Sequence, residues 1–141
     1  MARIFVSYAR EDAETAEKLV TRLRGWEHEV WWERALRPGT NWSDSSESEL
    51  QRADCVVILW SLHSIASPWA RIEAHYALQN DCLVPLRLDD SEIPDEFRAL
   101  QTIDLLSTPL DQIDAQLSVA IQSVTRKRRR IRHWVLAAVA C

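Results

Sequence analysis

Glycine is scarce in this chain, where only Gly25 and Gly39 occur among 141 residues. The loops that cradle phosphate groups need several glycines at fixed spacing, as in the GxGxxG fingerprint or the P-loop. Neither motif is present in the sequence. Nucleotide binding by a glycine-rich loop is therefore excluded.

Cysteine is also sparse, because only Cys55, Cys82 and Cys141 occur, widely spaced and with no CxxC pair. No cysteine–histidine cluster has the spacing of zinc ligands. We therefore expect a reduced, cytoplasmic domain with no metal site. The first residues, "MARIFVSYARED", reach acidic side chains too early to form the apolar core of a secretory signal.

A long apolar run is missing as well. The run that begins at Trp134 has eight apolar or small residues, against the ~20 that span a bilayer. It follows the basic cluster "RKRRRIR" of residues 126–132, and this order is typical of the cytoplasmic flank of a membrane helix. Two interpretations of residues 126–141 stay open. One is the start of a truncated membrane anchor, which would place the domain on the cytosolic face of an inner membrane, and the other is a solvated basic helix end.

The basic cluster hides a strongly acidic domain. It holds six of the 17 basic residues and none of the 21 acidic ones, which leaves 11 basic against 21 acidic residues in 1–125. Nucleic-acid binding depends largely on neutralising phosphates. We therefore expect no nucleic-acid partner.

Short apolar runs alternate with helical patterns along the chain. Runs without polar alternation are typical of parallel strands that helices cover on both faces. The expected fold class is α/β, with a doubly wound parallel sheet and a last helix that begins near Pro109. The five predicted strands are residues 3–8, 29–32, 55–61, 82–88 and 102–106.

In such a sheet the ligand lies beyond the carboxyl ends of the strands. This rule selects "SYARED", "ERALRPGTNW" and "SLHSIASPWARIE", which follow the first three strands. A phosphoacceptor receiver domain would need aspartates where Ser7, Tyr8, Trp60 and Ser61 stand, so that alternative is excluded.

The stretch "SPWARIE" predicts a helix that begins at Pro68, with Ser67 as its N-cap. Trp69 and Glu73 are four residues apart and share a face of this helix. A carboxylate near a helix N-terminus is stabilised by the helix dipole, by roughly 0.3–1 kcal/mol. Helix stabilisation is therefore one open interpretation of Glu73.

Three stretches together resemble the Toll/interleukin receptor (TIR) domain family, and its bacterial branch in particular. They are "IFVSYARED", "WWERALRPGTNW" and the SxWxxxE pattern of Ser67, Trp69 and Glu73. The match covers residues 3–125. We therefore expect a flavodoxin-like five-stranded parallel sheet of order 2-1-3-4-5, a TIR domain over 1–125, and a basic juxtamembrane-like tail with the start of an apolar segment over 126–141.

The resemblance implies an enzyme, because many bacterial and plant TIR domains cleave NAD+ at the bond between nicotinamide and ribose. It also implies that Glu73 is the catalytic residue and that NAD+ is a substrate, with no cofactor. One carboxylate can suffice for this reaction. The nicotinamide ring of NAD+ is a pyridinium cation and becomes neutral when its bond to the ribose breaks, so no general acid is needed to protonate it. The product would be ADP-ribose or a cyclic isomer of it, and the family suggests a role in antiphage defence.

The remaining site residues are hypotheses of the same kind. The substrate-binding candidates are Ser7, Tyr8, Arg10, Arg37, Trp42 and Trp69, and the candidate self-association loop is Leu36, Arg37, Pro38 and Gly39. For Trp69 a core position is an equal alternative, and for the arginines a plain surface position is the default. His63 and His75 are assigned no chemistry, since no partner lies at nucleophile or metal spacing.

Two other functions stay open. TIR domains also act as non-enzymatic signalling scaffolds through homotypic contacts, although such adaptors usually lack the glutamate in this context. Many TIR enzymes need self-association, so a homo-oligomer is expected for either function. A nucleoside deoxyribosyltransferase, which uses a glutamate in a related fold, is a further alternative.

Overall fold

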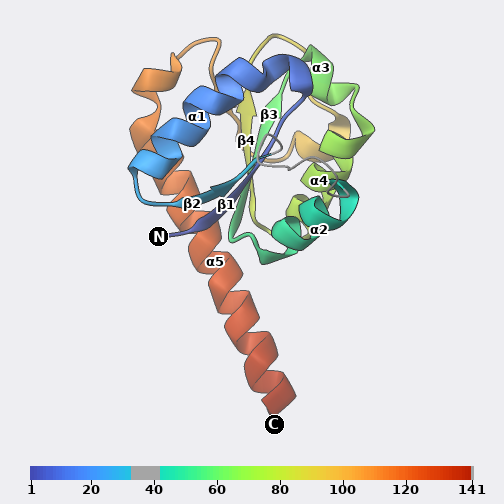
Figure 1. The fold of residues 1–141 in the computed structure, drawn as a ribbon, viewed down its shortest axis with the longest axis vertical. Coiled ribbons are helices and arrows are strands. Elements are labelled where there is room, and N and C mark those ends of the chain that lie inside the picture. The colour runs from blue at the N-terminus through green and yellow to red at the C-terminus, as the bar shows by residue number, and fades with distance from the viewer. Residues whose placement is uncertain (33–41, 141) are drawn as a thin grey trace.

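The computed structural model describes residues 1–32 and 42–140 and has the expected α/β architecture (Figure 1). Its parallel sheet has the order β2-β1-β3-β4-β5, which confirms the predicted 2-1-3-4-5 topology. The strands are β1 Arg3–Ser7, β2 Glu29–Trp31, β3 Cys55–Trp60, β4 Leu83–Arg87 and β5 Ile103–Asp104.

The central strand β3 is buried along its whole length, as expected for an apolar run without polar alternation. Its register pairs Val57 with Val6 on one side and with Val84 on the other. The edge strand β2 is only partly buried. The fifth strand is shorter than predicted, because only two residues continue the ladder along β4.

Helices cover both faces of the sheet (Figure 1). On one face Leu19 and Leu23 of α1 pack in a cluster with Leu117 and Ile121 of α5. The opposite cluster contains Ala74 of α4, together with Leu50 of α2 and core residues such as Trp60. The helices are α1 Ala13–Gly25, α2 Trp42–Arg52, α3 Leu62–Ile65, α4 Pro68–Gln79 and α5 Asp114–Ala140, with single 3-10 turns at η1 Arg10–Asp12, η3 Asp95–Phe97 and η4 Leu110–Gln112.

The helix predicted to begin near Pro109 begins later, at Asp114. Pro109 instead precedes the 3-10 turn η4. The prediction was wrong because proline is tolerated at the start of either kind of helix, so its position alone does not show which one follows.

The basic residues of α5 reach back to the domain. Asp54, which precedes β3 and is buried, receives hydrogen bonds from Arg129 and Arg132 at 3.1 and 3.2 Å. Arg128 is buried and donates to the side-chain oxygen of Asn80 at 2.9 Å. Lys127 also pairs with Asp81 at 3.4 Å, so four of the six cations are not simply solvated. The helix α5 runs unbroken past the domain boundary predicted after residue 125.

Among the described helices, none is both long enough and apolar enough to cross a membrane.

His28 should make the stability of the fold depend on pH. Its Nδ1 accepts a hydrogen bond from the backbone N–H of Ala2 at 3.0 Å, and burial, together with the nearby N-terminal ammonium, lowers the pKa of His28 below its usual 6.5. The unfolded chain then binds the proton first, so stability should be full above pH 6.5 and fall below it. Urea unfolding across this range should show the loss, and His28→Gln should flatten the profile. An unchanged slope in that variant would contradict the role of His28.

Candidate functional site

A pocket of about 370 Å³ opens beyond the carboxyl end of β1, beside the start of α4. Ser67 caps α4 as predicted, since its hydroxyl accepts a hydrogen bond from the N–H of Ala70 at 3.3 Å, and Pro68 is the first helical residue. One and a half turns into the helix, Glu73 lines the pocket with only 9% of its surface exposed. The helix therefore places a carboxylate at the base of the pocket.

Ser7, at the end of β1, lies behind this carboxylate. Its hydroxyl donates to Oε1 of Glu73 at 3.2 Å, and the serine is only 1% exposed. The two residues are far apart in the sequence and meet because the carboxyl end of β1 faces the first turns of α4. Ser7 therefore contacts Glu73 and is not among the residues that line the pocket.

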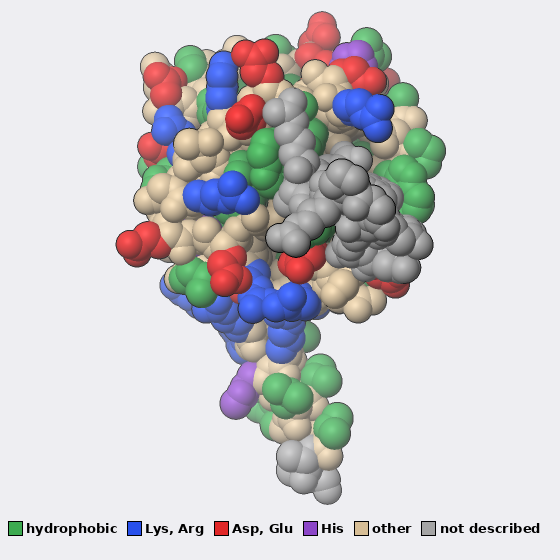
Figure 2. Space-filling view, in the orientation of Figure 1, with side chains coloured by type: hydrophobic (Ala, Val, Ile, Leu, Met, Phe, Trp, Pro, Cys, Tyr) green, Lys and Arg blue, Asp and Glu red, His purple; other side chains and the backbone are tan. Residues whose placement is uncertain are grey.

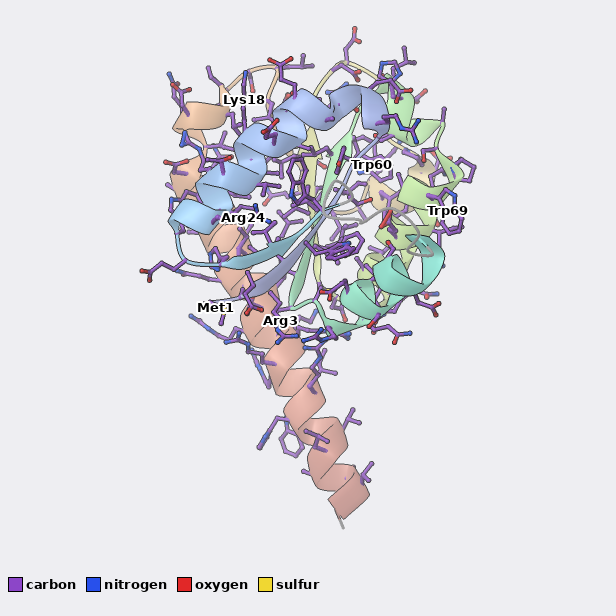
Figure 3. All side chains as sticks on the ribbon, viewed as in Figure 1. Met1, Arg3, Lys18, Arg24, Trp60 and Trp69 are labelled. Atoms are coloured by element: carbon purple, nitrogen blue, oxygen red, sulfur yellow. The ribbon has the colours of Figure 1, made fainter. Side chains whose placement is uncertain are left out.

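The other predicted site residues of the described chain also come together. Tyr8, Arg10 and Trp69 all line the same pocket as Glu73. Trp69 is 51% exposed, and Figure 3 shows it at the outside of α4, whereas Trp60 lies inside the fold. The core interpretation of Trp69 is therefore wrong, because its side chain is half exposed and lines the pocket.

Tyr8 is buried and its ring contacts that of Trp32, with centroids 6.1 Å apart. Tyr8 forms one wall of the pocket, and this contact holds it against Trp32, which directly follows the edge strand β2. Arg10 begins the turn η1 and is exposed at the mouth. A guanidinium at that place suits the phosphate oxygens of a ligand.

His63 also lines the pocket, although the sequence analysis assigned it no chemistry. It lies in α3, directly after the carboxyl end of β3, where the rule for ligand sites in parallel sheets would have placed it. Its position after β3 is therefore a signal in the sequence, although no catalytic partner lies at the usual spacing from it.

Hydrogen bonds fix the short helix α3 in its place. The Ser61 hydroxyl donates to Asp12 and accepts from the N–H groups of His63 and Ser64. Asp89 accepts from the N–H of Leu62 at 2.9 Å. Partial burial opposes ionisation of Asp89, but hydrogen bonds from Ser91 and Leu62 outweigh it and hold the pKa of this carboxyl below its usual range.

Part of the predicted site lies outside the described residues. This applies to Arg37 and to the candidate self-association loop of Leu36, Arg37, Pro38 and Gly39. Trp42 begins α2, but its side chain is not described either. The described residues contain no cluster of metal-ligating side chains.

A larger hollow of about 590 Å³ lies over α1, but its chemistry fits an anion poorly. Its walls include Glu14, Glu17 and Asp111, while its two cations are already paired with carboxylates. Lys18 lies 3.8 Å from Glu14, and Arg22 lies 3.1 Å from Asp114. The pocket at Glu73 is therefore the better candidate site.

Comparison with solved structures supports the fold. The chain superposes on the TIR domain of the Toll-related Receptor TRR-2 from Hydra magnipapillata with a TM-score of 0.68, at 16% identity, over 89% of this chain and 97% of that one. It also matches a TIR-STING receptor from C. gigas, solved in complex with 2',3'-cGAMP, with a TM-score of 0.66 and 24% identity. That match covers 86% of this chain and 39% of the receptor. Both relatives are animal proteins, so the bacterial branch stays a prediction.

A search of curated proteins finds no significant match. The family model of the TIR domain matches residues 4–119. This range contains the sheet except for Arg3, the first residue of β1, and every side chain described above for the pocket. The chain belongs to the TIR domain family.

Proposed function

We propose that this TIR domain is an NAD+ nucleosidase that releases nicotinamide and leaves ADP-ribose or a cyclic isomer of it. The observation that carries the proposal is the Glu73 carboxylate, buried at the base of a pocket and held by the hydroxyl of Ser7. A carboxylate used only to stabilise the helix would not need to line a pocket. The SxWxxxE pattern of catalytic TIR domains supports the same role.

The proposed reaction needs one carboxylate. The bond between C1 of the ribose and the pyridinium nitrogen breaks, and its electron pair leaves with nicotinamide, which becomes neutral. Positive charge develops on the ribose, and the Glu73 carboxylate stabilises it more strongly in a buried site than in water. Water or a nucleophile within the ADP-ribose then attacks C1, and in hydrolysis the proton of the water passes to solvent.

The other residues of the pocket have roles that follow from their chemistry. Trp69 offers an aromatic face on which a base of the dinucleotide can stack. Arg10 offers a guanidinium for the pyrophosphate, and Tyr8 forms the wall beside it. Arg37 and Trp42, which precede or begin α2, remain proposed ligand contacts on the strength of the sequence pattern alone.

We further infer that self-association through residues 36–39 completes the site, and that the enzyme works in the cytosol. A role in bacterial antiphage defence is inferred from the family alone. The second candidate function is a non-enzymatic scaffold, which membership of the TIR family supports equally. Glu73 in its pocket favours the enzyme over the scaffold.

The proposal is tested by incubating the full chain with NAD+ over a wide range of protein concentration and measuring nicotinamide by chromatography. Activity per molecule should rise steeply with concentration if assembly completes the site. Strict proportionality to enzyme would contradict assembly control. Deoxynucleosides in parallel reactions test the deoxyribosyltransferase alternative, and base exchange on them without cleavage of NAD+ would overturn the proposal.

Ser7→Ala should slow NAD+ cleavage by roughly ten- to a hundredfold, because a hydrogen bond to a charged group is worth about 1.5–3 kcal/mol. The loss should appear in kcat, with KM little changed, since Ser7 acts through Glu73. Ser123→Ala, at an exposed position of α5, is the matched control and should be neutral. A Ser7→Ala variant as active as the control would show that Ser7 does not position the carboxylate.

A further inference from the structure

The last turns of α5 leave the domain and carry only apolar or small side chains. Figure 1 shows the end of the helix projecting beyond the rest of the fold. Trp134 and Leu136 are each 69% exposed, and Val139 is 80% exposed. Each of these side chains is left to solvent at a cost of roughly 1–3 kcal/mol relative to an apolar environment. The segment 134–139, called the tip below, therefore needs a partner.

The distribution of side chains around the tip identifies the kind of partner. Successive residues of a helix are turned by about 100°, so Trp134, Val135 and Leu136 point in three different directions. All three are more than half exposed, and Ala137, Ala138 and Val139 fill the remaining directions. A second copy of the helix would cover one stripe and leave the others in water. Lipid can surround the tip on all sides.

Cations lie immediately beside the tip. Figure 2 shows a band of Lys and Arg where α5 leaves the domain, with hydrophobic side chains beyond it. Arg126 and Arg130 are exposed and make no hydrogen bond or ion pair within the described part of the chain. Arg130 is one turn, or about 6 Å, before Trp134. Cations next to a tryptophan and an apolar segment match the order of anionic headgroups, interface and acyl chains in a bilayer.

We propose that the tip of α5 inserts into the surface of an anionic lipid bilayer, with Arg126 and Arg130 against the lipid phosphates. The inference goes beyond the proposed enzyme and does not depend on it.

The placement of α5 would keep the pocket open on the membrane. Arg132 is bound to Asp54, which immediately precedes β3, so the tip leaves from the amino-terminal edge of the sheet. Glu73 and Ser7 lie at the opposite, carboxyl-terminal edge. In a domain bound through the tip, the pocket would therefore lie on the side of the domain that faces away from the bilayer.

The test is flotation of the full chain with vesicles of phosphatidylcholine alone or mixed with phosphatidylglycerol. We expect the chain to float with the mixed vesicles and to be released as salt is raised. Arg126→Gln with Arg130→Gln should weaken binding by roughly thirtyfold, since each basic residue near the surface contributes about fivefold. Leu136→Ser with Val139→Ser should abolish flotation.

Val119→Ser is the matched control, because Val119 is equally exposed, at 66%, but lies on the part of α5 that packs on the sheet. It should float like the wild type. Circular dichroism of every variant reports folding, and the assay contains no NAD+, so its failure is separate from failure of the enzyme proposal. The inference is overturned if the wild type does not float with mixed vesicles, or if the tip variant floats unchanged. It is also overturned if the tip variant loses self-association in sedimentation while it retains lipid binding, because the occupant is then a second copy.

Discussion

Glu73→Gln should lower NAD+ cleavage by roughly a thousandfold or more, while the protein stays folded. The substitution keeps the size of the side chain and leaves an oxygen to accept the hydrogen bond of Ser7, but it removes the negative charge. Loss of a single preorganised group facing transition-state charge costs about 10²–10³ in kcat, and loss of a full charge in a buried site should cost at least as much.

Glu96→Gln is the matched control for this prediction. Glu96 lies beside α4, with its Oε2 at hydrogen-bond distance from Nδ1 of His75, at 3.1 Å, and it does not line the pocket at Glu73. It should change the rate by less than about twofold, because exposed pairs contribute little. Thermal unfolding of both variants separates loss of chemistry from loss of fold. Equal activity in Glu73→Gln and Glu96→Gln would remove Glu73 from the mechanism.

Asp54→Ala should have the largest effect on stability. Asp54 is 5% exposed and joins three parts of the chain, since it accepts from the backbone N–H of Arg3 at 3.0 Å and from Arg129 and Arg132 of α5. The alanine leaves the partly buried N–H of Arg3 without its acceptor and two guanidinium groups without their counter-charge. We expect the free energy of unfolding to fall by about 2–4 kcal/mol.

Asp81→Asn provides the comparison, because Asp81 is half exposed and pairs with Lys127 of α5 at 3.4 Å, and asparagine tolerates the positive φ at this position. An exposed pair of this kind contributes about 0–1 kcal/mol. Urea unfolding of both variants measures the difference, and amide hydrogen exchange should show the second half of α5 loosened in Asp54→Ala alone. A loss no greater than that of Asp81→Asn would contradict the clamp, by which we mean the contacts of Asp54 with Arg3, Arg129 and Arg132. Because two of these contacts come from residues beyond 125, the activity assays use the full chain rather than residues 1–125.

The elements of the sheet could be predicted because their signals are local. The central strand is a continuous apolar run, and α4 begins at Pro68 because serine caps a helix and proline fits its first position. The start of α5 was missed, since Pro109 allows a 3-10 turn as readily as an α-helix. The clamp at Asp54 was also missed, because its partners lie far along the sequence and carry no local pattern.

The sequence predicted which residues lie near the candidate site, but it did not predict the place of each one within it. The resemblance pointed to Glu73, Tyr8, Arg10 and Trp69, and the structure brings all four to one pocket. Ser7 was expected at the ligand, but at the end of β1 it lies behind the carboxylate. The position of Ser7 relative to the Glu73 carboxylate depends on how β1 packs against α4. Neither segment of the sequence predicts this packing by itself.

The central claim is that one carboxylate suffices because the nicotinamide of NAD+ is already a good leaving group. NADH tests this directly, since its dihydronicotinamide carries no positive charge and would need a general acid in order to leave. The measurement is the release of the free base from NAD+ and from NADH by concentrated, self-associated wild-type chain, followed by chromatography. The account predicts nicotinamide from NAD+ and no corresponding base from NADH. No release from NAD+ by the folded assembly, or equal cleavage of both dinucleotides, would contradict it.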